Sequence, residues 1–419
     1  MSLDKMVVHG GIELNGEVTA SGAKNSALIL LFSSLLAEGK HTFRNVPELM
    51  DVDSAGKLLQ SLGCETKREG STYTVNVKRP SSMEAHYDLV RKMRASILCL
   101  GPLLAKYGEA IVSLPGGCAI GTRPIDLHLE GMKALGAEIV LEEGYVKAHA
   151  KKLKGANILF ETVTVGGTEN LMMAASLAEG TTVLENAAKE PEIVDLAEYL
   201  NKMGAKIKGA GTSIITIEGV STLRPAEHTV MTDRIEAGTL VIAVAISCGE
   251  VTVLNINPDW IESLIFKLKE SGFKISSNKN SVTIHKAKSW QAVDITTAPY
   301  PLFPTDLQAQ FMALMSVAEG TSVISETVFE NRFMHVQELC RLGADINPKN
   351  RVCVVRGKPN GLKGAPVMAT DLRASASLVL AGLSAKGETT VGRIYHLDRG
   401  YERLEEKLSK LGAKIGRVQ

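Results

Sequence analysis

Basic side chains stand at the predicted starts of apolar helices. Lys24 lies in Gly22-Ala23-Lys24-Asn25-Ser26, Arg94 opens a second such helix, and Arg373 opens another. A cation at a helix N-terminus opposes the helix dipole, so helix capping does not explain these residues. A bound anion would resolve the conflict, because helix N-termini and guanidinium groups both bind phosphate and carboxylate. The sequence therefore predicts a site for a polyanionic ligand.

Loop arginines and Thr-Asp pairs extend this pattern. The loop arginines are Arg123, Arg332 and Arg399, and the pairs are Thr232-Asp233, Thr305-Asp306 and Thr370-Asp371. Aspartate is a favourable N-cap, and surface arginine is common, so each residue alone has an ordinary structural explanation. Their recurrence at equivalent positions favours a shared anion site in a cleft.

Cys118 is the candidate acid or nucleophile. Its loop runs from Leu114 to Pro124 and contains three glycines and two prolines, which forbid regular structure. A thiol on an exposed glycine loop near Arg123 is where a cysteine pKa can fall. The alternative is an incidental loop cysteine.

No motif calls for a cofactor or a metal. Gly22–Ser26 lacks the Gly-Lys adjacency of a Walker loop, and Gly116-Gly117 lacks dinucleotide-binding spacing. The nine histidines show no metal-ligand spacing such as HExxH. We therefore expect neither a cofactor nor a metal.

Composition excludes several classes of protein. The 419 residues carry a net charge of +1, with 45% hydrophobic and 22% charged residues, which argues against disorder and against nucleic-acid binding. The longest apolar stretch is too short for a membrane span, and the N-terminus does not resemble a signal peptide. Six cysteines without a CxxC pair predict a reduced, cytoplasmic protein.

An internal repeat of about 70 residues organises the chain. A short phrase centred on glycine recurs at Gly63, Gly136, Gly204, Gly272, Gly343 and Gly412. Each copy predicts an apolar helix that stops at a glycine, a strand, an amphipathic helix and another strand. The predicted apolar helices are 26–37, 95–106, 170–178, 235–247, 307–318 and 374–385.

The six copies predict an α/β fold of two halves with three repeats each. Helices that are apolar nearly all round should be buried among the sheets. We place the first domain at 22–230, with the Cys118 loop, and the second at 1–21 and 231–419. The predicted active site lies in the cleft between the two domains.

The chain resembles the UDP-N-acetylglucosamine enolpyruvyl transferase (1-carboxyvinyltransferase) family over essentially its whole length. The motifs that carry the resemblance include SGAKNSAL, SLPGGCAIGTRPIDLH, FPTDLQAQF, ETVFENRFMHV and MATDLRASASLVLAG. The resemblance implies two inside-out α/β barrel-like domains, the enolpyruvyl transferase fold. It also implies transfer of the enolpyruvyl group of phosphoenolpyruvate to the 3′-hydroxyl of UDP-N-acetylglucosamine, the first committed step of peptidoglycan synthesis.

The resemblance assigns roles to individual residues. Cys118 would be the acid and Asp306 the base, with Lys24 and Arg399 also in the catalytic set. Phosphoenolpyruvate would be bound by Lys24, Asn25, Arg123, Arg332, Arg373 and Arg399. UDP-N-acetylglucosamine would contact Arg94, Arg123, Pro124, Ile125, Asp126, Leu127, Asp306 and Val328.

Two rival functions stay open at this stage. One is the sister enzyme 5-enolpyruvylshikimate-3-phosphate synthase, which lacks the Pro-Gly-Gly-Cys loop. The other is a catalytically silent repeat scaffold that binds anions or proteins. Thr162 stands where many family members have lysine, so we assign no nucleotide contact to residues 161–166. The sequence leaves the oligomeric state open.

Overall fold

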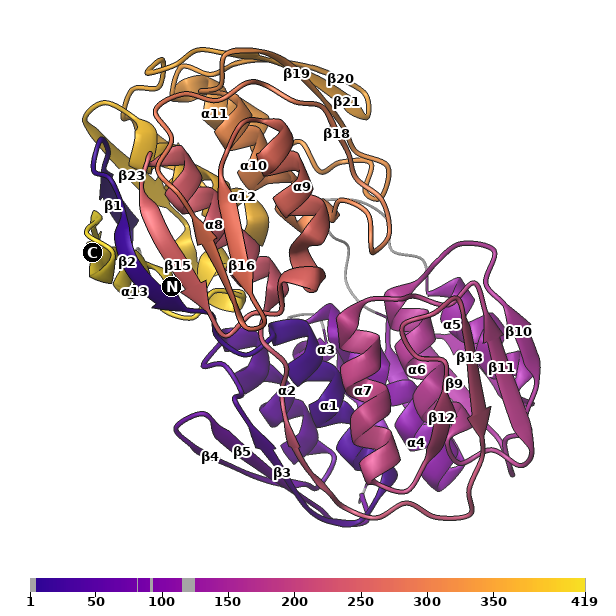
Figure 1. Cartoon of the computed structure of the whole chain (residues 1–419). Coiled ribbons are helices and arrows are strands. Elements are labelled where there is room, and N and C mark those ends of the chain that lie inside the picture. Colours follow the sequence, from indigo (N-terminus) through magenta and orange to yellow (C-terminus); the bar gives the residue numbers. More distant parts are fainter. Residues whose placement is uncertain (1–4, 81, 91–92, 115–124, 419) are drawn as a thin grey trace. The chain divides into compact units, whose positions relative to one another are not determined.

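The computed structural model describes residues 5–80, 82–90, 93–114 and 125–418, without the side chain of Arg94. These residues form two compact units (Figure 1). Unit 1 contains residues 5–21 and 232–418, and unit 2 contains the described residues between 22 and 231. Each unit is described by itself.

The described strands form six four-stranded sheets, three in each unit. In unit 2 the first sheet has the strand order β14 (Glu227–Thr229), β3 (Gly39–Arg44), β5 (Thr72–Val77) and β4 (Glu65–Glu69). The second has the order β6 (Glu84–Ala85), β7 (Glu109–Ser113), β9 (Tyr145–His149) and β8 (Glu138–Glu142). The third has the order β10 (Asn157–Leu159), β11 (Thr181–Glu185), β13 (Ile214–Glu218) and β12 (Lys206–Lys208). In unit 1 the first sheet has the strand order β2 (Asn15–Thr19), β15 (Glu250–Leu254), β17 (Ser281–Ile284) and β16 (Ile275–Asn278). The second has the order β18 (Ile295–Thr296), β19 (Gly320–Ser325), β21 (Val352–Gly357) and β20 (Asp345–Lys349). The third has the order β22 (Pro366–Met368), β23 (Glu388–Gly392), β1 (Lys5–His9) and β24 (Lys414–Val418).

All six sheets share one topology. The first strand pairs in parallel with the second, and the remaining pairs are antiparallel, as in β18, β19, β21 and β20. The N-terminal β1 completes the sheet of β22, β23 and β24, and β14 completes the sheet of β3, β4 and β5. Each unit therefore closes on itself through a strand that is distant in sequence.

Three long apolar helices form the centre of each unit, and amphipathic helices accompany them. The central helices are α1 (Lys24–Ser33), α4 (Leu100–Tyr107) and α6 (Val165–Ala175) in unit 2, and α8 (Arg234–Ile246), α10 (Gln308–Met315) and α12 (Leu372–Ser384) in unit 1. The amphipathic helices are α2 (Met50–Ser61), α5 (Asp126–Ala134), α7 (Pro191–Lys202), α9 (Glu262–Glu270), α11 (Val336–Arg341) and α13 (Leu404–Lys410). Short elements are α3 (Tyr87–Val90) and the 3₁₀ turns η1 (Ser34–Leu36), η2 (Arg94–Cys99), η3 (Pro258–Ile261), η4 (Thr305–Leu307) and η5 (Ile394–Arg399).

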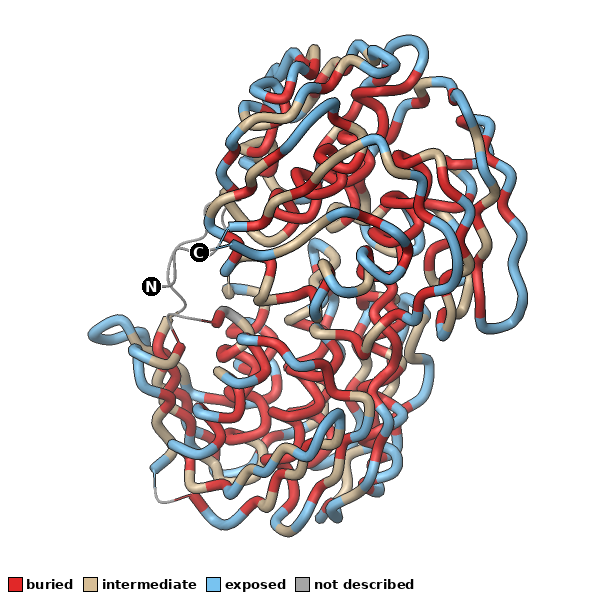
Figure 2. The backbone as a smooth tube through the Cα atoms, turned by 90° about the vertical axis from the view of Figure 1, so that its left-hand side faces the viewer, coloured by how far each residue is buried: buried red, intermediate tan, exposed pale blue. Residues whose placement is uncertain are grey.

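Each unit has its own hydrophobic core around its central helices. Every residue of α8 is buried, as expected for a helix that is apolar on all sides. Figure 2 shows buried backbone concentrated inside each unit and exposed backbone on its outer loops. The α/β fold with three helix-strand repeats in each half, which was expected from the sequence, is confirmed.

Local backbone geometry explains most of the repeat markers. The six repeat glycines from Gly63 to Gly412 have φ between 91° and 106°, a region that favours glycine. The apolar helix of the fourth repeat does not stop at a glycine with positive φ, because Cys248 rather than Gly249 adopts that conformation, with a φ of 57°. Helix α6 begins at Val165 rather than Asn170, because the Thr164 hydroxyl caps it by accepting from the Gly167 N–H at 3.1 Å.

Among the described residues, no helix combines the length and the apolar character needed to cross a membrane.

His128 in α5 is held neutral inside unit 2. The Asn170 side chain accepts from the Gly101 N–H at 2.8 Å, so its amide nitrogen points to His128 Nδ1 at 3.1 Å. An amide nitrogen can only donate, and Nδ1 must therefore accept, as it does in neutral imidazole. Burial lowers the pKa of His128 to about 4.

We expect this histidine to make unit 2 acid-sensitive. In the unfolded chain this imidazole binds a proton below pH 6.5, whereas in the folded protein it binds one only below about pH 4. The free energy of unfolding therefore falls as the pH drops through that window. At pH 5 the loss is about 2 kcal/mol. His128→Asn keeps an acceptor for Asn170, and it should flatten the pH dependence of denaturant unfolding between pH 7 and pH 5. His149→Asn, at an exposed position in β9, is the control, and an equal effect there would contradict the prediction.

Candidate active site

Asp306 lies between two buried arginines in unit 1. Arg332 Nη2 donates to Asp306 Oδ1 at 2.5 Å, and Arg373 Nη2 donates to Oδ2 at 3.4 Å. The two arginine side chains are 6% exposed, whereas the Asp306 side chain is 27% exposed. A ligand can therefore reach the carboxylate, and the cations lie behind it.

The two arginines determine the charge state of Asp306. Burial by itself raises the pKa of this carboxyl, but the charges and hydrogen bonds of Arg373 and Arg332 outweigh burial and hold the pKa well below its usual range. Asp306 is consequently ionised at neutral pH. Its basicity would increase if a competing anion drew the two guanidinium groups away.

The structure separates Asp306 from the other Thr-Asp pairs. Asp233 and Asp371 are N-caps, each accepting from two backbone N–H groups at the start of α8 and α12. In the described structure, no side-chain cap bond is made at the start of η4 or α10, so Asp306 is not a cap. The capping interpretation is therefore correct for two pairs and wrong for the third.

Arg373 also has the geometry of an anion-binding residue. Its guanidinium lies over the Tyr401 ring, 5.4 Å from the centroid. Its Nη1 is buried and has no hydrogen-bond partner among the described residues. An unsatisfied buried donor is costly, which favours an acceptor supplied by a ligand.

Lys24 begins α1 in unit 2. Its Nζ lies 3.2 Å from Asp51 Oδ2 of α2, with both side chains mostly buried. Asn25 follows it and is exposed, and the N-cap position, Ala23, provides no side-chain cap within the described residues. Within the described residues the start of α1 is therefore not capped by a side chain, and the positive end of its helix dipole would favour an anion.

The other predicted residues are distributed over both units. Arg399, in η5 of unit 1, is half-buried, and Val328 of the same unit is 37% exposed. In unit 2, Asp126 begins α5, with Ile125 before it and Leu127 after it. Cys118, Arg123, Pro124 and the side chain of Arg94 lie outside the described residues, as does most of the Cys118 loop.

Sequence reasoning missed Glu326. This residue follows β19 directly and is 1% exposed. It lies inside the motif ETVFENRFMHV, but nothing about its type or spacing distinguished it from the other glutamates of the chain. Its place in the same motif as Val328 and Arg332 was the only signal that the sequence offered.

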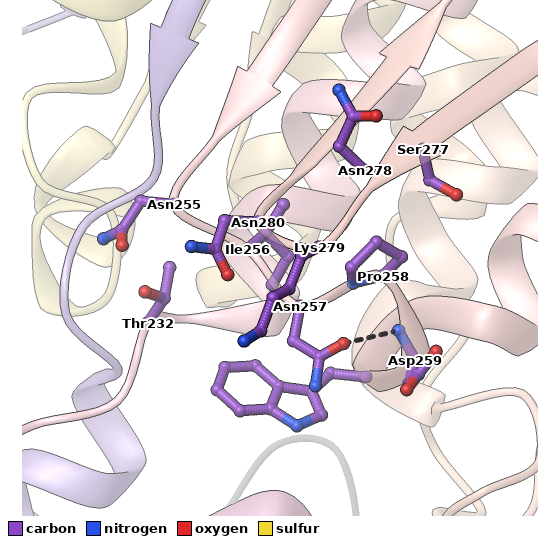
Figure 3. A pocket seen from close by; sticks show the side chains of 11 residues that line it. Thr232, Asn255, Ile256, Asn257, Pro258, Asp259, Ser277, Asn278, Lys279 and Asn280 are labelled. Carbon is purple, nitrogen blue, oxygen red and sulfur yellow. Dashed lines mark hydrogen bonds between the residues drawn. The ribbon is translucent and has the colours of Figure 1, made fainter.

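A hollow of about 630 Å³ lies elsewhere in unit 1 (Figure 3). Four asparagines line it together with Lys279 and Trp260, and Asn257 accepts from the Asp259 N–H at 3.1 Å. Its lining includes Thr232, of the first Thr-Asp pair, but none of the residues assigned to phosphoenolpyruvate or to the nucleotide sugar. Within the described part of the chain, no group of three or more His, Cys, Asp or Glu side chains is arranged so that it could hold a metal ion.

Comparison with known proteins identifies the family of the chain. The family model described as "EPSP synthase (3-phosphoshikimate 1-carboxyvinyltransferase)" matches residues 8–408. The chain therefore belongs to this family.

Curated relatives with high sequence identity to the chain carry the name of one enzyme of this family. A UDP-N-acetylglucosamine 1-carboxyvinyltransferase from Bdellovibrio bacteriovorus is 70% identical, over 99% of this chain and 100% of the relative. A protein of the same name from Myxococcus xanthus is 59% identical, over 99% of both chains.

Solved structures agree at the level of fold. The enolpyruvyl transferase NikO from Streptomyces tendae superposes with a TM-score of 0.90 at 26% identity, covering 100% of this chain and 99% of that one. An EPSP synthase from Acinetobacter baumannii gives a TM-score of 0.77 at 17% identity, over 99% and 100% of the two chains.

Proposed function

We propose that this protein transfers the enolpyruvyl group of phosphoenolpyruvate to the 3′-hydroxyl of UDP-N-acetylglucosamine, with release of phosphate, at the start of peptidoglycan synthesis. The observation that carries the proposal is the 70% identity, over essentially the whole of both chains, to a curated UDP-N-acetylglucosamine 1-carboxyvinyltransferase. The likeness to EPSP synthase, at 17% identity, concerns the fold alone. A cytoplasmic location belongs to the proposal, because the free thiols Cys64, Cys99 and Cys353 suit a reducing compartment.

Phosphoenolpyruvate carries a phosphate and a carboxylate, and the proposed site offers separate groups for each. Lys24, Asn25 and Arg399, with Arg123, would bind the phosphate. The position of Lys24 and Asn25 at the start of α1, where the helix dipole favours an anion, supports that assignment. Arg332 and Arg373 would bind the carboxylate. The unpartnered Nη1 of Arg373 supports this second assignment.

The proposed reaction begins with proton transfer. The Cys118 thiol gives a proton to the methylene carbon of phosphoenolpyruvate, and cationic character develops on the neighbouring carbon. The sugar hydroxyl oxygen bonds to that carbon and gives its proton to Asp306. The tetrahedral product then expels phosphate, which carries away the proton held by Asp306. The Cys118 thiolate takes a proton from the new methyl group, which restores the double bond and the thiol.

Carboxylate binding would activate the base. The substrate carboxylate competes with Asp306 for Arg332 and Arg373, which together hold the pKa of Asp306 low. Exchange of these ion pairs raises the pKa of Asp306 at the moment when the sugar hydroxyl must lose its proton. Asp306 is thus kept ionised before the substrate arrives and becomes a better base afterwards.

The proposed function is tested by phosphate release from phosphoenolpyruvate with UDP-N-acetylglucosamine, and in parallel with shikimate 3-phosphate. Release with the nucleotide sugar alone is the expected result. Release with shikimate 3-phosphate instead would assign the sister activity, and no release with either acceptor would favour a silent scaffold.

Arg399→Ala should raise the KM for phosphoenolpyruvate by at least about tenfold, because a charge-assisted contact to an anion is lost. The KM for UDP-N-acetylglucosamine should change far less. Arg356→Ala, an arginine of β21 with a 53% exposed side chain, is the matched control. Unchanged use of phosphoenolpyruvate by the Arg399 variant would contradict its assignment.

A further inference from the structure

Glu326 is a buried carboxylate that joins three segments of unit 1. Its Oε1 accepts from Thr297 Oγ1 and the Val328 N–H, both at 2.8 Å, and from the Phe329 N–H at 3.1 Å. Its Oε2 accepts from Thr305 Oγ1 at 2.8 Å. Four donors thus satisfy one carboxylate, which accounts for a charge that is 1% exposed.

Each branch of this network ends at a residue of the proposed substrate site. The Oε1 branch fixes the backbone of Val328 and Phe329, where the nucleotide sugar would bind. The Oε2 branch fixes Thr305, whose neighbour in η4 is Asp306. Thr305 Oγ1 also accepts from Arg332 Nη1 at 2.8 Å.

The direction of the hydrogen bonds at Thr305 follows from the carboxylate. An ionised carboxylate can only accept, so the Thr305 hydroxyl gives its single proton to Glu326. Its lone pairs then face Arg332, which donates to them and to Asp306. Removal of Glu326 would free the Thr305 hydroxyl and take away the carboxylate that accepts from the part-buried N–H groups of Val328 and Phe329.

We propose that Glu326 is a positioning residue that holds the Asp306 turn and the Val328–Phe329 loop in the arrangement that binds the nucleotide sugar. The inference rests on the proposed function and adds a specificity-determining residue to that site. Glu326 does not itself touch the substrate in this account. It acts through Thr305, Val328 and Phe329.

The test is calorimetric titration of UDP-N-acetylglucosamine into the full-length protein and its variants. Glu326→Ala should weaken binding at least about tenfold, because several buried hydrogen bonds are lost at once. Glu326→Gln should stay within about threefold of the wild type, since the amide oxygen can keep the Oε1 branch. Ser322→Ala, which removes a buried hydrogen bond to Val293 from β19, should lower the melting temperature without changing the affinity.

Calorimetry separates positioning from folding. A merely structural role would reduce the binding-competent fraction, and hence the stoichiometry, while the folded remainder kept wild-type affinity. If Glu326→Ala does not fold, Thr305→Val removes the Oε2 branch, together with the bond from Arg332 Nη1, and leaves the Oε1 branch intact. It should still weaken binding several-fold, with recovery in Thr305→Ser. The inference would be overturned if Glu326→Ala and Thr305→Val both bound the nucleotide sugar with wild-type affinity. If Glu326→Ala does not fold, wild-type affinity in Thr305→Val alone would overturn it. Neither result would contradict the proposed function. Failure of the wild-type protein to bind the nucleotide sugar would overturn both.

Discussion

Asp306→Asn should reduce turnover by about a hundredfold to ten-thousandfold, which is the typical contribution of a general base. Asparagine occupies nearly the same volume, and its single amide oxygen can still accept a hydrogen bond from one of the two arginines, but it cannot take the proton of the sugar hydroxyl. Binding of UDP-N-acetylglucosamine should therefore persist while kcat collapses. Single-turnover phosphate release, with binding measured separately, checks both statements.

Asp345→Asn is a matched control for this variant. Asp345 also pairs with two cations, Arg356 and Lys358, but it lies on β20 with its side chain 36% exposed. Loss of this charge should leave turnover within about twofold of the wild type, because exposed ion pairs contribute little. Comparable activity losses in the two variants would argue that Asp306 acts through stability rather than as a base.

The second large effect is expected at Cys118. Cys118→Ser should lose most turnover, because a serine hydroxyl is a far weaker acid than a thiol. This prediction rests on the family resemblance and on the chemistry of the thiol, since Cys118 lies outside the described residues. Wild-type rates in the serine variant would end the acid assignment.

Cys118→Asp separates the acid from the nucleophile. Aspartate can donate a proton but is not a soft nucleophile, so this variant should stay active and resist the thiol-alkylating antibiotic fosfomycin. Cys340→Ser, which removes an exposed free thiol, should remain fully sensitive to the drug. An inactive aspartate variant that is still alkylated at another residue would count against this account of Cys118.

Much of the fold could be predicted from the sequence because its signals are local. The repeat glycines from Gly63 to Gly412 indicate a backbone conformation that other residues adopt only at a cost in free energy. Helices that are apolar on all sides indicate burial. These signals gave six copies of one unit and the apolar helices near their observed bounds. They could not show that β1 completes the sheet of β22, β23 and β24, because that pairing joins residues at opposite ends of the chain.

The candidate site, like the fold, could be predicted from the sequence only in part. The sequence by itself determined the types of its residues, an excess of cations with a few carboxylates, and hence the anionic character of the ligand. Only the tertiary structure decided which aspartate is a candidate base. Asp233 and Asp371 cap the helices that follow them directly, whereas Asp306 is held by arginines 26 and 67 residues away. Glu326 was hidden for the same physical reason, since a carboxylate becomes a positioning group through the donors that folding brings to it.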